Sequence, residues 1–391
     1  MDDFRNITEF VDSLPSRGFP GMDVTVARDH KILYRHSAGY TDMEAGVPVS
    51  GNELYYMYSC TKVVTCAAAL RLMERGGFIM SDPVSDYLPE FANVRVRSAS
   101  GAYSEPAKST ILMRHLFNMT SGYAYDLTNP CIQEVQVRTG GKCPTRETVA
   151  AMARMPIDFE PGTHFRYGLS HDILAAVVEV ISGERFSDFV KKNILDPCGM
   201  TESGFRMTDA VRARMAKLYS YNVKTGHAVP ATGGNVYILG TDYDSGGAGL
   251  ISSVSDYIKF ADALASGGVA ATGERILSSR SIDLMRRNCL TPSQLVEFED
   301  RWHGLIGYGY GYGVRTYLGG EGGSLSPVGQ FGWQGAAGSY VIIDPSTRTS
   351  LFFAMHMLHN QENFVFPRLC NSFFSSGDVT SDSDLHTPRV E

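Results

Sequence analysis

The sequence lacks long apolar runs and blocks of like charge. Its apolar runs stay below the roughly 18 residues that a membrane-spanning helix needs. The net charge of −7 is modest and spread along the chain, with no cluster rich in lysine and arginine. A nucleic-acid-binding surface usually carries such a cluster. We therefore expect neither a nucleic-acid partner nor a membrane partner.

Targeting and cysteine signals are also absent. Residues 1–10 are acidic and lack the basic segment and apolar stretch of a secretory signal, which predicts a cytoplasmic protein. The seven cysteines are an odd number, and their spacing matches no zinc site. Cys131 and Cys143 flank a glycine-rich loop and are placed to pair in an oxidising compartment. A cytoplasmic address favours free thiols instead.

Several familiar catalytic motifs are missing. No G-x-S-x-G is present, which argues against an α/β-hydrolase, and no H-E-x-x-H indicates a zinc peptidase. The run from Gly307 to Gly313 is not a phosphate-binding loop, because Tyr312 stands where a glycine is needed. We expect no metal and no organic cofactor.

Two pairs of apolar segments lie near the opposite ends of the chain. Residues 23–29 and 31–39 are rich in β-branched side chains and predict a hairpin, as do residues 339–345 and 349–357. We expect both hairpins to share one antiparallel sheet, covered by helices from the two ends of the chain. The last of these helices, over residues 360–374, is expected to be interrupted at Pro367.

The middle of the chain reads as mostly helical. Residues 59–77 predict a helix so apolar that it must be deeply buried. Further helices are predicted over residues 109–122, 170–183 and 253–268, and loops over a cleft at residues 201–249. The domain prediction is one catalytic unit of two lobes and a tail: an α/β lobe of residues 1–80 and 245–375, a helical lobe of residues 81–244, and a polar tail of residues 376–391.

Ser59 and Lys62 begin the long apolar helix. Residues three apart lie on the same helix face, so the lysine amine can approach the serine hydroxyl. The free N–H groups and dipole of a helix N-terminus stabilise negative charge there. Burial of Lys62 would favour its neutral form, which is the form that can act as a base. The alternative is a helix-capping serine followed by a solvated lysine.

The S-x-x-K motif and its surroundings resemble the serine β-lactamase-like superfamily, which includes class C β-lactamases, family VIII carboxylesterases and penicillin-binding proteins. The segments that carry the resemblance are residues 72–91, 111–127, 159–183, 194–205 and 246–264, in the order of the family. The resemblance implies a β-lactamase/transpeptidase-like fold, an antiparallel sheet flanked by terminal helices with an inserted helical region. It also implies that Ser59 is a nucleophile activated by Lys62.

The second motif of the family, Tyr-x-Asn, reads Tyr167-Gly168-Leu169. By resemblance, Tyr167 moves the Ser59 proton and assists the leaving group. A tyrosinate beside an ammonium and a tyrosine beside a neutral lysine both remain open. Leu169 replaces the asparagine whose amide would hold the carbonyl group of a β-lactam or peptide side chain. We expect Leu169 and Tyr125 to contact the substrate.

The third motif, often Lys-Thr-Gly, reads Trp333-Gln334-Gly335. By resemblance these residues line the substrate site, and the N–H of Ala336 joins that of Ser59 in an oxyanion hole. The tryptophan removes the cation that would meet a substrate carboxylate. It suits an uncharged or aromatic acyl group instead.

Together these features predict a serine hydrolase of the carboxylesterase type, acting through an acyl-enzyme on a small-molecule ester. A β-lactamase, a D-amino-acid peptidase and an acyltransferase of the same fold are the alternatives. A non-catalytic penicillin-binding-like sensor is a further one. The physiological substrate and the oligomeric state are left open by the sequence.

Overall fold

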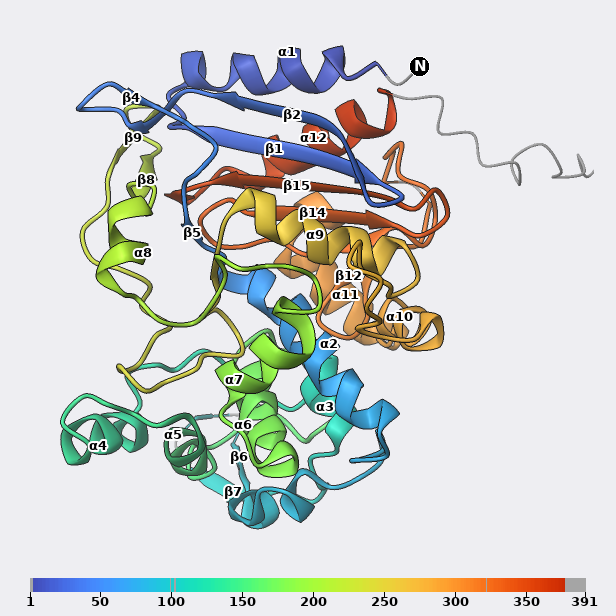
Figure 1. Cartoon of the computed structure of the whole chain (residues 1–391). Helices are drawn as coiled ribbons and strands as arrows, with labels where there is room; N and C mark the ends of the chain where they lie inside the picture. The colour runs from blue at the N-terminus through green and yellow to red at the C-terminus, as the bar shows by residue number, and fades with distance from the viewer. Residues whose placement is uncertain (1–2, 99, 102, 321, 377–391) are drawn as a thin grey trace, which may run out of the picture.

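An antiparallel sheet of seven strands forms one side of the molecule (Figure 1). The computed structural model describes residues 3–98, 100–101, 103–320 and 322–376. In spatial order the strands are β11 (Tyr308–Tyr310), β12 (Arg315–Tyr317), β13 (Phe331–Gly332), β14 (Tyr340–Asp344), β15 (Thr349–Met355), β1 (Met22–Arg28) and β2 (Lys31–Ala38). β1 pairs with β15, so that Met22 lies opposite Met355. The predicted sheet that joins both ends of the chain is confirmed.

Helices cover both faces of this sheet, because its strands are apolar on both sides. Helices α1 (Arg5–Ser13) and α12 (Glu362–Phe374) share a buried cluster with alternate residues of β1 and β15. Helix α9 (Val254–Ala265) packs on the opposite face, where Tyr257 stacks on Phe352 with ring centroids 4.2 Å apart. The terminal helices therefore lie where the sequence placed them.

Helix α12 runs through Pro367 without a break, so the predicted interruption is wrong. A proline inside a helix removes one backbone hydrogen bond and crowds the preceding turn. Five side chains of this helix are buried against the sheet, among them Phe366, whose ring stacks on Tyr340 with centroids 4.3 Å apart. This packing outweighs the local preference of the proline.

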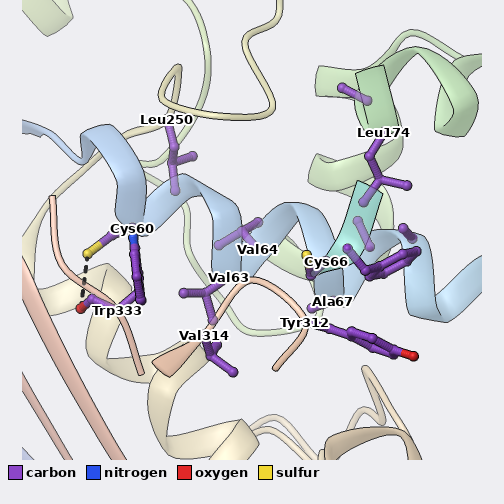
Figure 2. Close-up of a cluster of buried hydrophobic side chains, with 14 of the residues drawn as sticks. Cys60, Val63, Val64, Cys66, Ala67, Leu174, Leu250, Tyr312, Val314 and Trp333 are labelled. Atoms are coloured by element: carbon purple, nitrogen blue, oxygen red, sulfur yellow. Dashed lines mark hydrogen bonds between the residues drawn. The ribbon is translucent and has the colours of Figure 1, made fainter. Parts of the chain in front are cut away.

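The long apolar helix is α2 (Thr61–Glu74), and it connects the sheet to the helical part of the molecule (Figure 1). It is buried on nearly all sides, because α6 (Ser170–Ser182), the loop at Leu250 and the strand-end residue Val314 surround it (Figure 2). Ser59 lies in a 3-10 turn, Tyr58–Cys60, directly before this helix rather than within it. The deep burial predicted from composition is confirmed.

The helix predicted over residues 109–122 is much shorter than expected. Only Met113–Phe117 (α3) is helical. The preceding residues are extended instead, because Ile111 O accepts a hydrogen bond from Val84 N–H and Leu112 bridges to Pro83. A tertiary backbone pairing has replaced the first turns of the helix.

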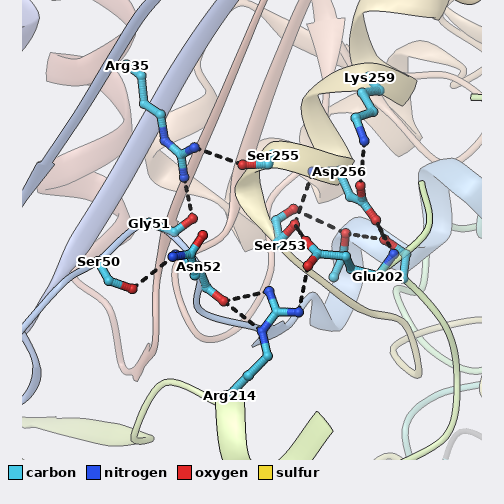
Figure 3. Close-up of polar contacts among 12 residues, drawn as sticks. Arg35, Ser50, Gly51, Asn52, Glu202, Arg214, Ser253, Ser255, Asp256 and Lys259 are labelled. Carbon is cyan, nitrogen blue, oxygen red and sulfur yellow. Dashed lines mark hydrogen bonds and ion pairs between the residues drawn. The ribbon is translucent and has the colours of Figure 1, made fainter. Parts of the chain in front are cut away.

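The region of residues 201–249 contains short elements as well as loops. A network of polar contacts ties it to the loop at Asn52 and to the start of α9 (Figure 3). Arg214 of α8 (Asp209–Arg214) pairs with Glu202 at 2.6 Å and donates to Asn52 O at 2.7 Å. Each of these partly exposed contacts adds little to the stability of the fold, and a network of them contributes more than isolated pairs do.

The remaining elements fill the space between these parts. The other helices are α4 (Pro130–Arg138), α5 (Thr145–Met152), α7 (Phe186–Val190), α10 (Ser279–Met285) and α11 (Pro292–Arg301). The short strands are β3 (Tyr40–Asp42), β4 (Val47–Pro48), β5 (Tyr55–Tyr56), β6 (Arg95–Arg97), β7 (Ser104–Pro106), β8 (Tyr219–Asn222), β9 (His227–Pro230), β10 (Ile251–Ser252) and β16 (Met357–Leu358).

The structure also bears on the predicted tail, on the possible pairing of two cysteines and on membrane-spanning helices. Apart from Ser376, the predicted tail lies outside the described residues. Cys131 and Cys143 are both free thiols. In the described part of the chain, no helix combines the length and apolar character of a membrane span.

The burial of α2 against α6 gives a stability prediction. Leu174 of α6 is fully buried and faces α2 (Figure 2). We expect Leu174→Ala to lower the free energy of unfolding by about 2–5 kcal/mol, because it removes buried methyl groups and leaves a cavity. Denaturant titration measures this loss. The matched control Leu325→Ala, at a leucine that is 58% exposed, should change stability by no more than about 0.5 kcal/mol. Equal losses in both variants would contradict the packing described here.

Candidate active site

The turn that carries Ser59 is held from both sides. Met57 N–H donates to Leu250 O at 2.9 Å, and strand β5 pairs with β10 just beyond it. Tyr58 has a φ of +44°, a left-handed conformation that costs an aromatic residue of order 1 kcal/mol or more. The surrounding structure therefore imposes one geometry on the residue before Ser59.

Lys62 lies beneath Ser59, fully buried. Its Nζ is 3.2 Å from Ser59 Oγ, 2.8 Å from the Tyr125 hydroxyl and 2.7 Å from Gly247 O. Burial lowers the pKa of Lys62 to about 7, although the Asp172 carboxylate nearby opposes this shift. At neutral pH a large fraction of this amine is unprotonated.

Asp172 is a site residue that sequence reasoning missed. It is buried in the first turn of α6, five residues after Tyr167. It accepts hydrogen bonds from the Ser245 hydroxyl at 2.7 Å and the Tyr243 hydroxyl at 2.9 Å. Asp172 thereby fixes the segment that presents Gly247 O to Lys62. An acidic residue in the first turn of a mostly apolar helix was the signal available in the sequence.

Tyr167 also lies beside Ser59 and Lys62. Its ring centroid is 4.6 Å from Lys62 Nζ, and it lines the same cleft as Ser59. The Trp333 indole N–H donates to the Tyr167 hydroxyl at 2.8 Å. Burial raises the pKa of Tyr167 well above 10, even though the contacts with Ser59 and Trp333 act in the opposite direction. Tyr167 is therefore a neutral phenol at physiological pH.

Trp333 has a different position from the one expected of a substrate contact. It borders the cleft but is only 1% exposed. Its ring packs edge-on against Trp302 and Tyr310, with centroids 5.4 and 5.0 Å away. The indole is thus occupied in holding Tyr167, which leaves little surface for a ligand.

The segment after Trp333 lies directly against the Ser59 turn. A Cβ atom at Gly335 would meet Met57 O at 2.4 Å, so only glycine permits this approach. Ala336 is exposed to the cleft, and its N–H has no acceptor among the described residues. Asn360, a second residue missed in the sequence, donates through Nδ2 to Gly335 O at 3.2 Å and to Ala336 O at 3.0 Å. Asn360 is only 4% exposed, so it clamps this turn from inside the protein.

A cleft of about 970 Å³ opens above these groups. The predicted site residues that line it are Ser59, Tyr125, Tyr167, Trp333, Gln334, Gly335 and Ala336. Leu169 is not among them, so its prediction as a substrate contact is wrong. The side chain is 1% exposed and packs in the core at the start of α6, while its N–H donates to Tyr123 O at 3.2 Å.

The chemistry of the site comes from side chains and backbone amides. No cluster of histidine, cysteine, aspartate or glutamate in the described ranges is suited to a metal ion. The site combines the Ser59 hydroxyl with a lysine of lowered pKa, a neutral phenol and an N–H group without an acceptor among the described residues. This combination suits nucleophilic attack on a carbonyl group.

Comparisons with known proteins show the family and the fold of the chain. The family model described as Beta-lactamase matches residues 4–376. Esterase EstB of Burkholderia gladioli is 32% identical over 275 residues, which cover 65% of this chain and 68% of EstB. Lovastatin esterase of Penicillium rubens is 27% identical, covering 80% of this chain and 79% of the esterase. The solved structure of EstCE1, a hydrolase with promiscuous acyltransferase activity, superposes with a TM-score of 0.77 at 22% identity, over 95% of this chain and 98% of EstCE1. The chain belongs to the β-lactamase family.

Proposed function

We propose that this protein is a carboxylesterase that forms an acyl-enzyme on Ser59. The observation that carries the proposal is the 3.2 Å contact of Ser59 Oγ with Lys62 Nζ, which also lies 4.6 Å from the Tyr167 ring centroid, at a cleft that Ser59 and Tyr167 both line. The similarity to an esterase and to a hydrolase with acyltransferase activity supports the same reaction class.

The three contacts of Lys62 define its part in the reaction. Gly247 O can only accept, and the Tyr125 hydroxyl accepts at 2.8 Å, so the two N–H bonds of a neutral amine are used there. The remaining lone pair then faces the Ser59 hydroxyl. Of the two proton arrangements that the sequence left open, the neutral lysine beside a neutral Tyr167 is the one we propose.

Acylation follows from this starting state. Ser59 Oγ attacks the ester carbonyl carbon while its proton moves to Lys62 Nζ. The carbonyl oxygen becomes an oxyanion that accepts hydrogen bonds from the N–H groups of Ser59 and Ala336. When the C–O bond to the alcohol breaks, Tyr167 gives its proton to the leaving oxygen and recovers one from Lys62.

Deacylation reverses these proton transfers. Water attacks the acyl carbon, its proton passes through Tyr167 to Lys62, and Ser59 leaves with the proton that Lys62 returns. An alcohol in place of water would give acyl transfer with the same residues.

The residues of the second and third motifs favour an ester over a β-lactam as the substrate. An indole that donates to Tyr167 replaces the cation that would hold a lactam carboxylate. Leu169, buried in the core, leaves no amide in the second motif to hold a lactam or peptide group.

Covalent labelling tests the proposed nucleophile. A fluorophosphonate probe should modify Ser59, as identified by peptide mapping, and Ser59→Ala should abolish this labelling. The same substitution should lower the rate of p-nitrophenyl butyrate hydrolysis at least about 10³-fold. The matched control Ser109→Ala, at an exposed serine, should behave as the wild type. Wild-type hydrolysis in folded Ser59→Ala protein would refute the mechanism. Turnover of nitrocefin as fast as that of the ester would refute the substrate class.

The low pKa of Lys62 predicts the pH dependence. Below pH 7 Lys62 is protonated and cannot accept the Ser59 proton, so kcat/KM should fall about tenfold per pH unit. Above pH 7 it should reach a plateau. A pH–rate profile from pH 5 to 9 with a neutral ester measures this. Lys62→Arg, which stays protonated, should lose about 10²–10⁴-fold of the activity. A wild-type midpoint above pH 9 would contradict the neutral-lysine mechanism.

The clamp formed by Asn360 predicts a positioning effect. Asn360→Leu removes both hydrogen bonds to the turn that presents Ala336 N–H. We expect kcat to fall by about tenfold while KM stays within about twofold, since the oxyanion is bound only in the transition state. Steady-state kinetics and thermal unfolding should be measured together. Asn371→Leu, at an amide outside the cleft, is the control. A loss of kcat that merely follows a loss of folded protein would contradict the role.

A further inference from the structure

The cleft is larger than a short acyl group needs. Its volume of about 970 Å³ is at the upper end of pockets that bury drug-sized ligands. Its lining extends from Ser59 to Val223, Val236 and helix α12, so a substrate bound at Ser59 has room for a large non-reacting part.

Some of the side chains that line the cleft are apolar and exposed to solvent. Val223 is 75% exposed and Val236 is 69% exposed, and Leu358 and Phe364 line the same hollow. Single exposed valines are common on protein surfaces. These two border the cavity that contains Ser59, so they offer hydrocarbon surface to whatever binds there. We refer to Val223, Val236, Leu358 and Phe364 as the apolar rim.

The loop that carries Val236 is fixed to the catalytic groups. Its neighbour Tyr237 packs edge-on against Tyr125, with ring centroids 4.9 Å apart. Asn235 accepts from Tyr237 N–H at 3.1 Å and donates to Ala248 O at 2.7 Å. Ala248 follows Gly247, whose carbonyl holds Lys62. Val236, and with it this part of the rim, therefore has a defined position relative to Ser59.

The same cleft is also lined by charged and amide groups. They are Arg301, Glu362, Asn363 and Arg368, and the Arg368 guanidinium lies over the Phe364 ring, 4.2 Å from its centroid. Hydrocarbon placed against these polar groups would desolvate charges, which is unfavourable. A ligand with an extended apolar part is therefore directed toward the rim.

We propose that the apolar rim is a binding subsite for the hydrocarbon part of the substrate, and that the preferred substrates are lipophilic esters with a long acyl or alcohol chain. This inference rests on the proposed function for the reaction itself. The binding it describes does not depend on catalysis and is measurable separately.

Tryptophan fluorescence gives that measurement, because the only two tryptophans of the chain, Trp302 and Trp333, both border the cleft. Amides that mimic esters serve as probes: N-ethyloctanamide extends the acyl side, N-octylacetamide extends the alcohol side, and N-ethylacetamide extends neither. We expect at least one octyl amide to bind ten times more tightly than N-ethylacetamide, and the tighter of the two identifies which side the rim receives.

Variants locate the binding. Val223→Ser combined with Val236→Ser should weaken the octyl amide about tenfold and leave N-ethylacetamide within twofold. Val137→Ser, at a valine that is 83% exposed and outside the cleft, is the matched control and should change neither. Equal binding of short and long amides, or equal losses in the rim variant and the control, would overturn the proposal.

Ester kinetics separate this inference from the proposed function. With p-nitrophenyl acetate and octanoate, or with ethyl and octyl acetate if the alcohol side binds, the rim variant should lose about tenfold in kcat/KM on the long ester alone. Long-chain binding without Ser59-dependent turnover would refute the esterase mechanism and leave the subsite standing. Turnover with no dependence on chain length would refute the subsite and leave the mechanism standing.

Discussion

The contact between Lys62 Nζ and Gly247 O organises the site. A buried lysine loses its hydration, and only the charge-neutral form is tolerated without a partner of opposite charge. Burial lowers the pKa of Lys62 to about 7, and Gly247 O gives the amine an acceptor that carries no full negative charge. The segment around Gly247, the turn before Ser59 and the start of α6 must then meet at one point, and the fold brings them together there.

The parts of the structure that the sequence predicted best are those with a local signal. The apolar pattern of α2 and the Ser59–Lys62 spacing depend on neighbouring residues. The buried helix was predicted correctly, and Ser59 Oγ lies 3.2 Å from Lys62 Nζ, although Ser59 stands in the turn before the helix. Asp172 and Asn360 were missed because their partners lie far away in the chain: Asp172 accepts from Ser245, and Asn360 donates to Gly335. Pro367 and the shortened α3 show the same limit, since tertiary packing and backbone pairing outweighed local preference there.

At the replaced motif positions the backbone is placed as the family resemblance implies, while the side chain makes different contacts. By resemblance, Trp333 takes the place of the lysine of the third motif, and its indole N–H donates to the Tyr167 hydroxyl and orients it. The backbone that follows is less sensitive to side-chain identity, because Gly335 is needed for close approach and Ala336 contributes an N–H group. Substrate preference can thus diverge at the side chains while the oxyanion geometry is retained.

The placement of Asp172 explains how a carboxylate can lie near the base without disabling it. A carboxylate paired directly with Lys62 would raise the pKa of the lysine and keep it protonated. The hydroxyl groups of Tyr243 and Ser245 both donate to Asp172, which orients the carboxylate toward them. Burial raises the pKa of Asp172, and these hydrogen bonds oppose that shift. The carboxylate therefore fixes the Gly247 segment by hydrogen bonding, and burial outweighs its field on the amine, so that the pKa of Lys62 is still lowered to about 7.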